Sequence, residues 1–287
     1  YMAGRPMFDR ADVIPQSVAD SLYNAAIEEA RKADLVIFMG GLNKNYQQDC
    51  EGEDRRAYEL PYGQDRLIEG LLKANKKLVV VLTSGNAVAM PWLKEVPSLV
   101  QSWYLGSIGG KALADVLLGE VTPSGKLPFS YPAKLEDCPA HYYGELSYPG
   151  DSIRQEYKED ILVGYRWYDT KHIQPLFPFG YGLSYTQFEY GKPVISAREM
   201  KGDDVLEIRC NVKNVGSVAG KEIVQLYIGD EKCRVLRPVK ELKGFEKIFL
   251  KAGESKKVSF KITPELLKFY NYNLDFVCES GDFEVMI

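Results

Sequence analysis

The 287-residue sequence predicts an α/β layer built on a mostly parallel sheet, followed by an antiparallel β-sandwich. Two apolar runs, residues 35–39 (LVIFM) and 78–82 (LVVVL), indicate buried strands. Continuous runs of this kind suit a parallel sheet that is covered on both faces. From residue 194 onward the apolar period changes to two, with turn residues about every ten positions. That alternation is typical of a β-sandwich.

The first layer alternates helices and strands. An apolar stripe of helical period predicts a helix over residues 17–30, with Ser17 as its N-cap. Further helices are expected over 62–75 and 111–118, and a third strand over 97–105. Three strand–helix units are few for a doubly wound domain, so we expect either a small sheet or, preferably, earlier strands outside this chain. Because position 1 is not Met, a fragment or a processed chain is also expected.

The apolar pattern is irregular over residues 133–185 and becomes regular again from about residue 194. Residues 133–185 are rich in Pro and Tyr, which predicts a long linker that packs on a neighbour. We therefore expect three regions: an α/β domain over 1–132, incomplete at its N-terminus, the linker over 133–185, and a β-sandwich over 186–287. The later strands are expected at 205–212, 222–228, 247–250, 257–262, 274–278 and 283–287, with a helical turn at 263–265.

Composition argues against several classes of protein. Hydrophobic residues make up 45% and charged residues 26%, as in an ordinary globular protein. The net charge of −4 and the lack of a polybasic run argue against nucleic-acid and membrane partners, and no apolar stretch approaches the roughly 20 residues that cross a bilayer. Five cysteines without CxxC spacing argue against a disulfide framework or a zinc site, and two histidines leave little scope for a His-activated nucleophile. No signal peptide is recognised, which leaves cytoplasmic, periplasmic and secreted locations open.

The stretch from residue 40 to 64 is the part of the sequence most suggestive of chemistry. It follows the first strand, at the edge where open α/β sheets bind ligands, and about twenty residues is long for such a loop. A carboxylic acid over a pocket is a candidate proton donor, and a solvated charged loop is the alternative. Tyr46 and Trp92 are candidates for stacking on a sugar face, although packing is the safer assumption. The loop's ionisable residues are Asp49, Glu51, Glu53, Asp54, Arg55 and Arg56.

Several motifs occur in order along the chain: GLN…DCEGEDR…LP-x-x-Q, VVVLTSG, PSGKLPFSYP, ILVGYRWYD and PLFPFGYGLSYTQFEY. Their combination and order resemble glycoside hydrolase family 3 over essentially the whole chain. The resemblance implies that the two layers are the family's α/β-sandwich and fibronectin type III-like domains. It also implies that the family's N-terminal (β/α)8 barrel, which carries the nucleophilic Asp and most sugar-binding residues, lies outside this chain, on the same polypeptide or on another fragment.

The same resemblance implies a retaining, exo-acting β-glycosidase, with β-glucosidase as the first choice, acting on the terminal non-reducing residue of β-linked oligosaccharides or glycosides. The family's general acid/base is a Glu shortly before an Asp-Arg pair, which assigns that role to Glu51, with Glu53 as a rival. Asp54 and Arg55 are expected to support the loop. Substrate-binding residues are not assigned, and the chemistry requires neither a metal nor a cofactor.

Other interpretations of the resemblance stay open. One alternative is a β-xylosidase of the same family, and another is a non-catalytic carbohydrate-binding or structural module. A nucleotide-binding protein is disfavoured, because GGLNKN after the first strand is too poor in glycine. Because double displacement needs both carboxyl groups, this chain alone is expected to be inactive. A homodimer is left open.

Overall fold

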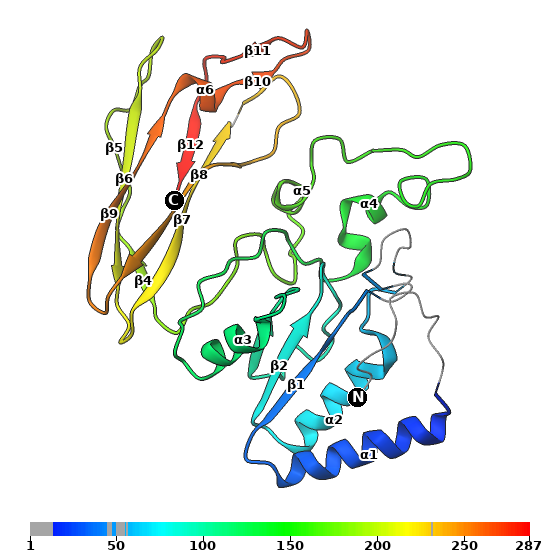
Figure 1. The fold of residues 1–287 in the computed structure, drawn as a ribbon. Coiled ribbons are helices and arrows are strands. Elements are labelled where there is room, and N and C mark those ends of the chain that lie inside the picture. Colours follow the sequence, from blue (N-terminus) through cyan, green and yellow to red (C-terminus); the bar gives the residue numbers. More distant parts are fainter. Residues whose placement is uncertain (1–13, 45–47, 50–54, 56, 231) are drawn as a thin grey trace. The chain divides into compact units, whose positions relative to one another are not determined.

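The computed structural model describes residues 14–44, 48–49, 55, 57–230 and 232–287 (Figure 1). The chain divides into two compact units, Tyr1–Ala114 and Asp115–Ile287. The first unit holds the α/β layer, and the second holds the sandwich together with the segment that precedes it. The domain boundaries expected at residues 132 and 185 stay predictions.

The first unit contains the expected parallel sheet. Strands β1 (Val36–Gly41), β2 (Leu78–Thr83) and β3 (Ser98–Gln101) lie in chain order, and both pairings are parallel. The middle strand is the core of the layer, since three of its side chains are completely buried: Val80, Val81 and Leu82. Burial of the middle strand on both faces explains why its sequence is a continuous apolar run.

Helix α2 (Gln64–Ala74) packs on one face of this sheet, and α3 (Gly109–Leu117) lies near the end of the other face. Helix α2 contacts β1 and β2, and α1 (Gln16–Lys32) packs on α2. Helix α3 contributes Leu113 to the same cavity wall as Met39 of β1. Met39 and the buried Phe38 are adjacent in the strand and therefore point to opposite faces.

Two local expectations for this unit are wrong. Ser17 lies inside α1, whose N-cap is Pro15 with ψ of 138°. The Pro15 carbonyl accepts the Val18 N–H at 2.9 Å, so the first turn closes earlier than predicted. The third strand stops at Gln101 instead of residue 105, because Trp103 takes a left-handed conformation with φ of 56°.

The second unit contains the expected antiparallel sandwich. Residues 186–287 form one sheet in the order β12-β7-β8 and another in the order β4-β6-β5, with β9 paired to β6. Inward side chains of both sheets, among them Val212, Val224 and Ile248, make the core. The elements are β4 (Phe188–Tyr190), β5 (Val194–Ile195), β6 (Leu206–Asn214), β7 (Gly220–Asp230), β8 (Glu241–Leu250), β9 (Ser255–Ile262), α6 (Pro264–Leu267), β10 (Phe269–Tyr270), β11 (Phe276–Val277) and β12 (Phe283–Met286).

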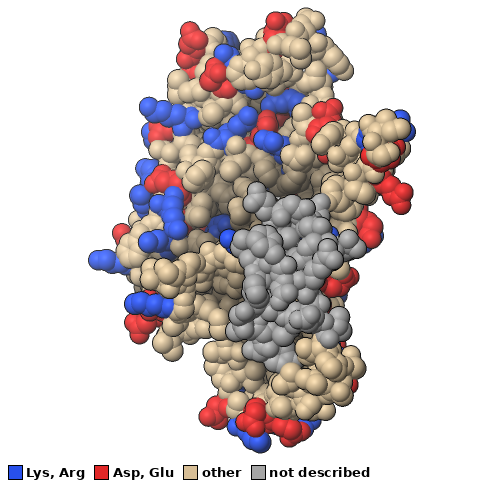
Figure 2. Space-filling view, turned by 45° about the vertical axis from the view of Figure 1, so that its right-hand side comes forward, with Lys and Arg blue, Asp and Glu red and all other residues tan. Residues whose placement is uncertain are grey.

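The segment expected as a linker has a small core of its own. It contains η2 (Leu135–Asp137), α4 (Pro139–Tyr142) and α5 (Tyr165–Lys171). Leu162, Trp167 and Tyr168 are buried together there. Elsewhere the surface is mixed in charge: Figure 2 shows acidic and basic side chains interspersed over the described residues of the face in view.

Candidate functional site

The long loop after β1 carries the predicted site residues. Glu51, Glu53 and Asp54 lie outside the described residues, and so does Tyr46. Arg55 is described, as are Gln48 and Asp49 before the loop's centre. Gln48, Asp49 and Arg55 therefore flank positions 50–54 in the chain, and their contacts are described below.

The first attachment of the loop is made by Gln48, which is buried. Its Oε1 accepts the N–H of Asn43 at 3.1 Å, and its Nε2 donates to the hydroxyl of Tyr62 at 2.6 Å. Tyr62 itself has a positive φ of 62° just before α2. The amide therefore ties the first flank of the loop to the residues that lead into the following helix.

Asp49 makes a second attachment, to the carboxyl ends of two strands. Its Oδ2 accepts the N–H of Gly85, which follows β2, at 2.6 Å. The same oxygen accepts the hydroxyl of Tyr104, which follows β3, at 2.7 Å. Its backbone N–H donates to the carbonyl of Asn43 at 2.9 Å. One carboxylate thus joins the loop to both neighbouring strand ends.

The other flank of the segment 50–54 returns to the same place. Arg55 Nη2 donates to the carbonyl of Ala87 at 2.6 Å, and the carbonyl of Tyr58 accepts the N–H of Ala89 at 2.9 Å. Since Asp49 is bonded to Gly85, both flanks of the segment are attached to the turn after β2. The described residues on either side of positions 50–54, Asp49 and Arg55, are thus held by neighbouring backbone groups.

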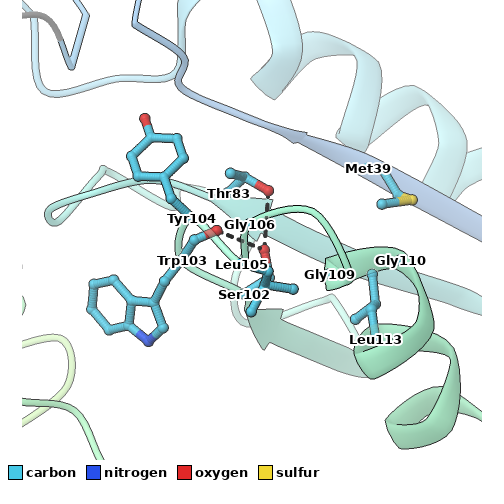
Figure 3. Close-up of a pocket in the computed structure, with 10 residues that line it drawn as sticks. All are labelled: Met39, Thr83, Ser102, Trp103, Tyr104, Leu105, Gly106, Gly109, Gly110 and Leu113. Carbon is cyan, nitrogen blue, oxygen red and sulfur yellow. Dashed lines mark hydrogen bonds between the residues drawn. The ribbon is translucent and has the colours of Figure 1, made fainter.

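A cavity of about 260 Å³ opens beside this attachment, at the carboxyl ends of β2 and β3 (Figure 3). Aromatic and apolar side chains line much of it, including Trp103, Tyr104 and Leu105. The hydroxyls of Thr83 and Ser102, which also line it, are bonded to each other at 3.0 Å. Such a wall suits an uncharged, partly apolar ligand better than a strongly charged one.

Tyr104 belongs both to this cavity and to the loop attachment. Partial burial raises the pKa of its phenol, and the hydrogen bond to Asp49 raises the pKa further. The positive charge of Arg55 acts on the same phenol in the opposite direction. Tyr104 therefore remains a protonated donor to Asp49 at ordinary pH.

Sequence reasoning missed Tyr104 and Gly85, and it named Asp49 only among the loop's ionisable residues. The available signals were an aromatic pair at the end of a predicted strand and a glycine directly after another. Trp92 is only 3% exposed, which confirms packing over sugar stacking for that residue. Among the described residues, no group of three potential metal ligands occurs. None of the helices in the described part of the chain is long and apolar enough to cross a membrane.

Comparison with known families gives a consistent result. Residues 6–185 match the description "Glycosyl hydrolase family 3 C-terminal domain", and residues 222–287 match "Fibronectin type III-like domain". These matches fall on the unit with the parallel sheet and its following segment, and on the antiparallel sandwich.

Known relatives and solved structures resemble the whole chain. Beta-glucosidase BoGH3A from Bacteroides ovatus is 68% identical over 100% of this chain and 39% of its own length. Thermostable beta-glucosidase B from Acetivibrio thermocellus is 45% identical over 94% of this chain and 35% of its own length. The crystal structure of a beta-glucosidase from Kluyveromyces marxianus in complex with glucose has a TM-score of 0.84 and 40% identity, covering 96% of this chain and 32% of that one. This chain thus spans between about a third and two fifths of the length of these proteins.

Proposed function

This chain belongs to glycosyl hydrolase family 3, and on that premise we propose that it forms the C-terminal part of a retaining, exo-acting β-glucosidase. In this role it supplies the general acid/base, Glu51, to an active site whose nucleophilic Asp lies on an N-terminal (β/α)8 barrel. The substrate is the terminal non-reducing residue of a β-linked oligosaccharide or glycoside. The whole-chain similarity to proteins named as beta-glucosidases carries this proposal.

The retaining reaction defines what Glu51 does. In the first step the nucleophile attacks the anomeric carbon, the bond to the leaving oxygen breaks, and the carboxyl group of Glu51 donates its proton to that oxygen. In the second step the Glu51 carboxylate takes a proton from water, whose oxygen attacks the anomeric carbon and releases the nucleophile. The acid form is thereby restored.

The attachments of the loop support this assignment. The segment that carries Glu51 runs from Asp49 to Arg55, and both of these residues bond to the turn after β2. A proton donor must be held within hydrogen-bond reach of the leaving oxygen, and misplacement by about 1 Å can cost 10²-fold in rate. We assign to Arg55, together with Asp54, the role of supporting the loop.

The test is a pair of substitutions in the full-length protein, Glu51→Gln and Glu53→Gln. Glu51→Gln should lower kcat on an unactivated β-linked disaccharide by about 10²- to 10⁴-fold, because the leaving oxygen then departs without a proton. The first step on a dinitrophenyl β-glucoside should change far less, because that leaving group needs little protonation. Glu53→Gln should leave both activities within a few-fold of the parent enzyme.

Two results would contradict the assignment. Turnover of the disaccharide by Glu51→Gln at the parent rate would remove Glu51 as the acid. The selective loss found with Glu53→Gln instead would transfer the role to the rival residue. The 287-residue chain alone should hydrolyse no aryl β-glucoside, and appreciable turnover would show that the nucleophile lies within it.

A further inference from the structure

Asp49 occupies an unusual position for a charged loop residue. Its Oδ2 receives two short hydrogen bonds, from the Gly85 N–H at 2.6 Å and from the Tyr104 hydroxyl at 2.7 Å. The two donors follow different strands and lie 36 and 55 residues further along the chain. A solvated loop tip would not be expected to collect donors from two separate elements of the fold.

Gly85 leaves room for these two hydrogen bonds because it has no side chain. A Cβ added there would lie 3.2 Å from Oδ2 of Asp49 and 3.3 Å from Cε2 of Tyr104. Both distances are tighter than ordinary van der Waals contacts, so a side chain at position 85 would push the carboxylate or the phenol aside. The absence of a side chain at Gly85 therefore keeps the Asp49 bonds short.

We propose that Asp49 is a positioning residue for the general acid/base, holding the catalytic loop to the carboxyl ends of β2 and β3 through Gly85 and Tyr104. The inference rests on the proposed function of Glu51. Asp49 precedes Glu51 by two residues, and two residues of chain span at most about 7 Å. Fixing Asp49 therefore restricts where the Glu51 carboxyl can reach.

Asp49 acts through this attachment and not as a proton donor itself. The oxygen that accepts two hydrogen bonds at 2.6 and 2.7 Å is committed to protein donors. Tyr104 also belongs to the wall of the cavity beside the loop. The attachment of the loop and this cavity therefore share a residue at the carboxyl end of β3.

The experiment uses Asp49→Asn and Tyr104→Phe in the full-length enzyme, with Glu51→Gln measured in parallel. Both positioning variants should lower kcat on an unactivated β-linked disaccharide by about 10- to 100-fold. On a dinitrophenyl β-glucoside they should change kcat/KM by less than about threefold, because the first step with that substrate depends little on the acid. The dependence of kcat/KM on leaving-group pKa should become steeper in both variants, as it does in Glu51→Gln.

Tyr190→Phe is the matched control. Tyr190 also donates its hydroxyl to a carboxylate, that of Glu222 at 3.1 Å, but it belongs to the β-sandwich. This variant should keep both activities within about twofold of the parent. Tyr104→Phe also serves where Asp49→Asn fails to fold, since it removes one hydroxyl and leaves the carboxylate in place.

The outcomes separate the two proposals. Equal losses on both substrates, or no loss on either, in Asp49→Asn and Tyr104→Phe would overturn the positioning role while Glu51→Gln still showed the selective loss. A Glu51→Gln variant without selective loss would instead overturn the proposed function, and the positioning role with it. Selective loss in all three variants, with Tyr190→Phe unchanged, is the result that supports both.

Discussion

The indole N–H of Trp92 donates a 2.7 Å hydrogen bond to Oδ1 of Asp65 in the first turn of α2. The other carboxylate oxygen accepts the N–H of Leu60 at 3.3 Å. Burial raises the pKa of Asp65, while the bonds from Trp92 and Leu60 oppose that rise without cancelling it. The pair therefore links the entrance of α2 to the segment between β2 and β3.

Trp92→Phe should destabilise the protein by about 1–3 kcal/mol at neutral pH, because a half-buried carboxylate loses a donor. The folded pKa of Asp65 lies above its unfolded value, so stability falls as pH rises through that interval. Loss of the indole N–H should raise the folded pKa further. The loss of unfolding free energy in Trp92→Phe, relative to the parent, should consequently grow between about pH 4 and pH 7. Calorimetric unfolding of the full-length protein measures it.

Asp65→Asn provides the control for this dependence, since an amide does not ionise. In the Asp65→Asn background, Trp92→Phe should lower the free energy of unfolding by the same amount at about pH 4 and pH 7. A deficit of Trp92→Phe that is independent of pH in the native background would show that only packing is lost.

Gln64 fixes the end of β1 through its side-chain amide. Its Oε1 accepts the Gly41 N–H at 2.7 Å, and its Nε2 donates to the Gly41 and Pro61 carbonyls at 2.8 and 3.0 Å. Gln64→Glu would set an oxygen against two carbonyls, so we expect a loss of about 2–3 kcal/mol by thermal unfolding. Gln174→Glu is the control, because it disturbs an exposed amide with a weak 3.4 Å contact to the Pro175 carbonyl. That variant should change stability by less than about 0.5 kcal/mol.

Asn214 is completely buried, and its amide is fully paired. Oδ1 accepts from the Thr186 hydroxyl at 2.6 Å and the Gly216 N–H at 3.0 Å. Nδ2 donates to the carbonyls of Val218 and Leu250 at 2.8 and 3.2 Å. An isosteric carboxylate would lose both donors and place a charge in the core of the sandwich.

Asn214→Asp should therefore lower stability by about 3 kcal/mol or more at pH 7, and by less in acid, where a protonated carboxyl regains one donor. Asn211→Asp on the same strand is the control, because residue 211 is on the exposed face of β6. Thermal unfolding of the two variants at pH 7 and pH 4 measures the difference. Equal effects at the two positions would contradict the role of the buried amide.

Three cationic side chains surround the carboxylate of Glu241. Its carboxylate is 3.0 Å from Arg237, 3.2 Å from Lys243 and 3.5 Å from Arg166, while Asp230 shares Arg237 at 2.9 Å. Burial raises the pKa of Glu241, but the bonds and charges of Arg237 and Lys243 together outweigh it and hold the pKa below the usual value. The ionised form is thus stabilised by folding.

Glu241→Gln should destabilise the protein by about 1–3 kcal/mol at pH 7. A depressed folded pKa gives stability that is present above the unfolded value of about 4.3 and is lost as pH falls through the folded value. The cost of the substitution should therefore shrink below about pH 4 in pH-dependent unfolding. Glu246→Gln on the same strand, which breaks an exposed pair with Lys256, should cost less than about 1 kcal/mol throughout.

The sequence predicted those elements whose signal is local. The run LVVVL of β2 and the alternation of β6 are direct consequences of burial on two faces and on one. Local signals fail where a single backbone angle determines the end of an element. The positive φ of Trp103, for example, ends β3 earlier than the apolar pattern predicts. Local signals also fail where the interacting residues are far apart in the sequence. Nothing in the sequence near Asp49 indicates that Gly85 and Tyr104 donate hydrogen bonds to it.

The exposed side of β1 affects how the protein can be handled. Strand β1 pairs only with β2 among the described residues, and its Ile37 and Met39 side chains are 46% and 65% exposed. An uncovered strand with apolar flanks recruits other strands. Purified in isolation, the 287 residues should self-associate in a concentration-dependent way through β1, whereas a longer product that shields this strand should stay monodisperse.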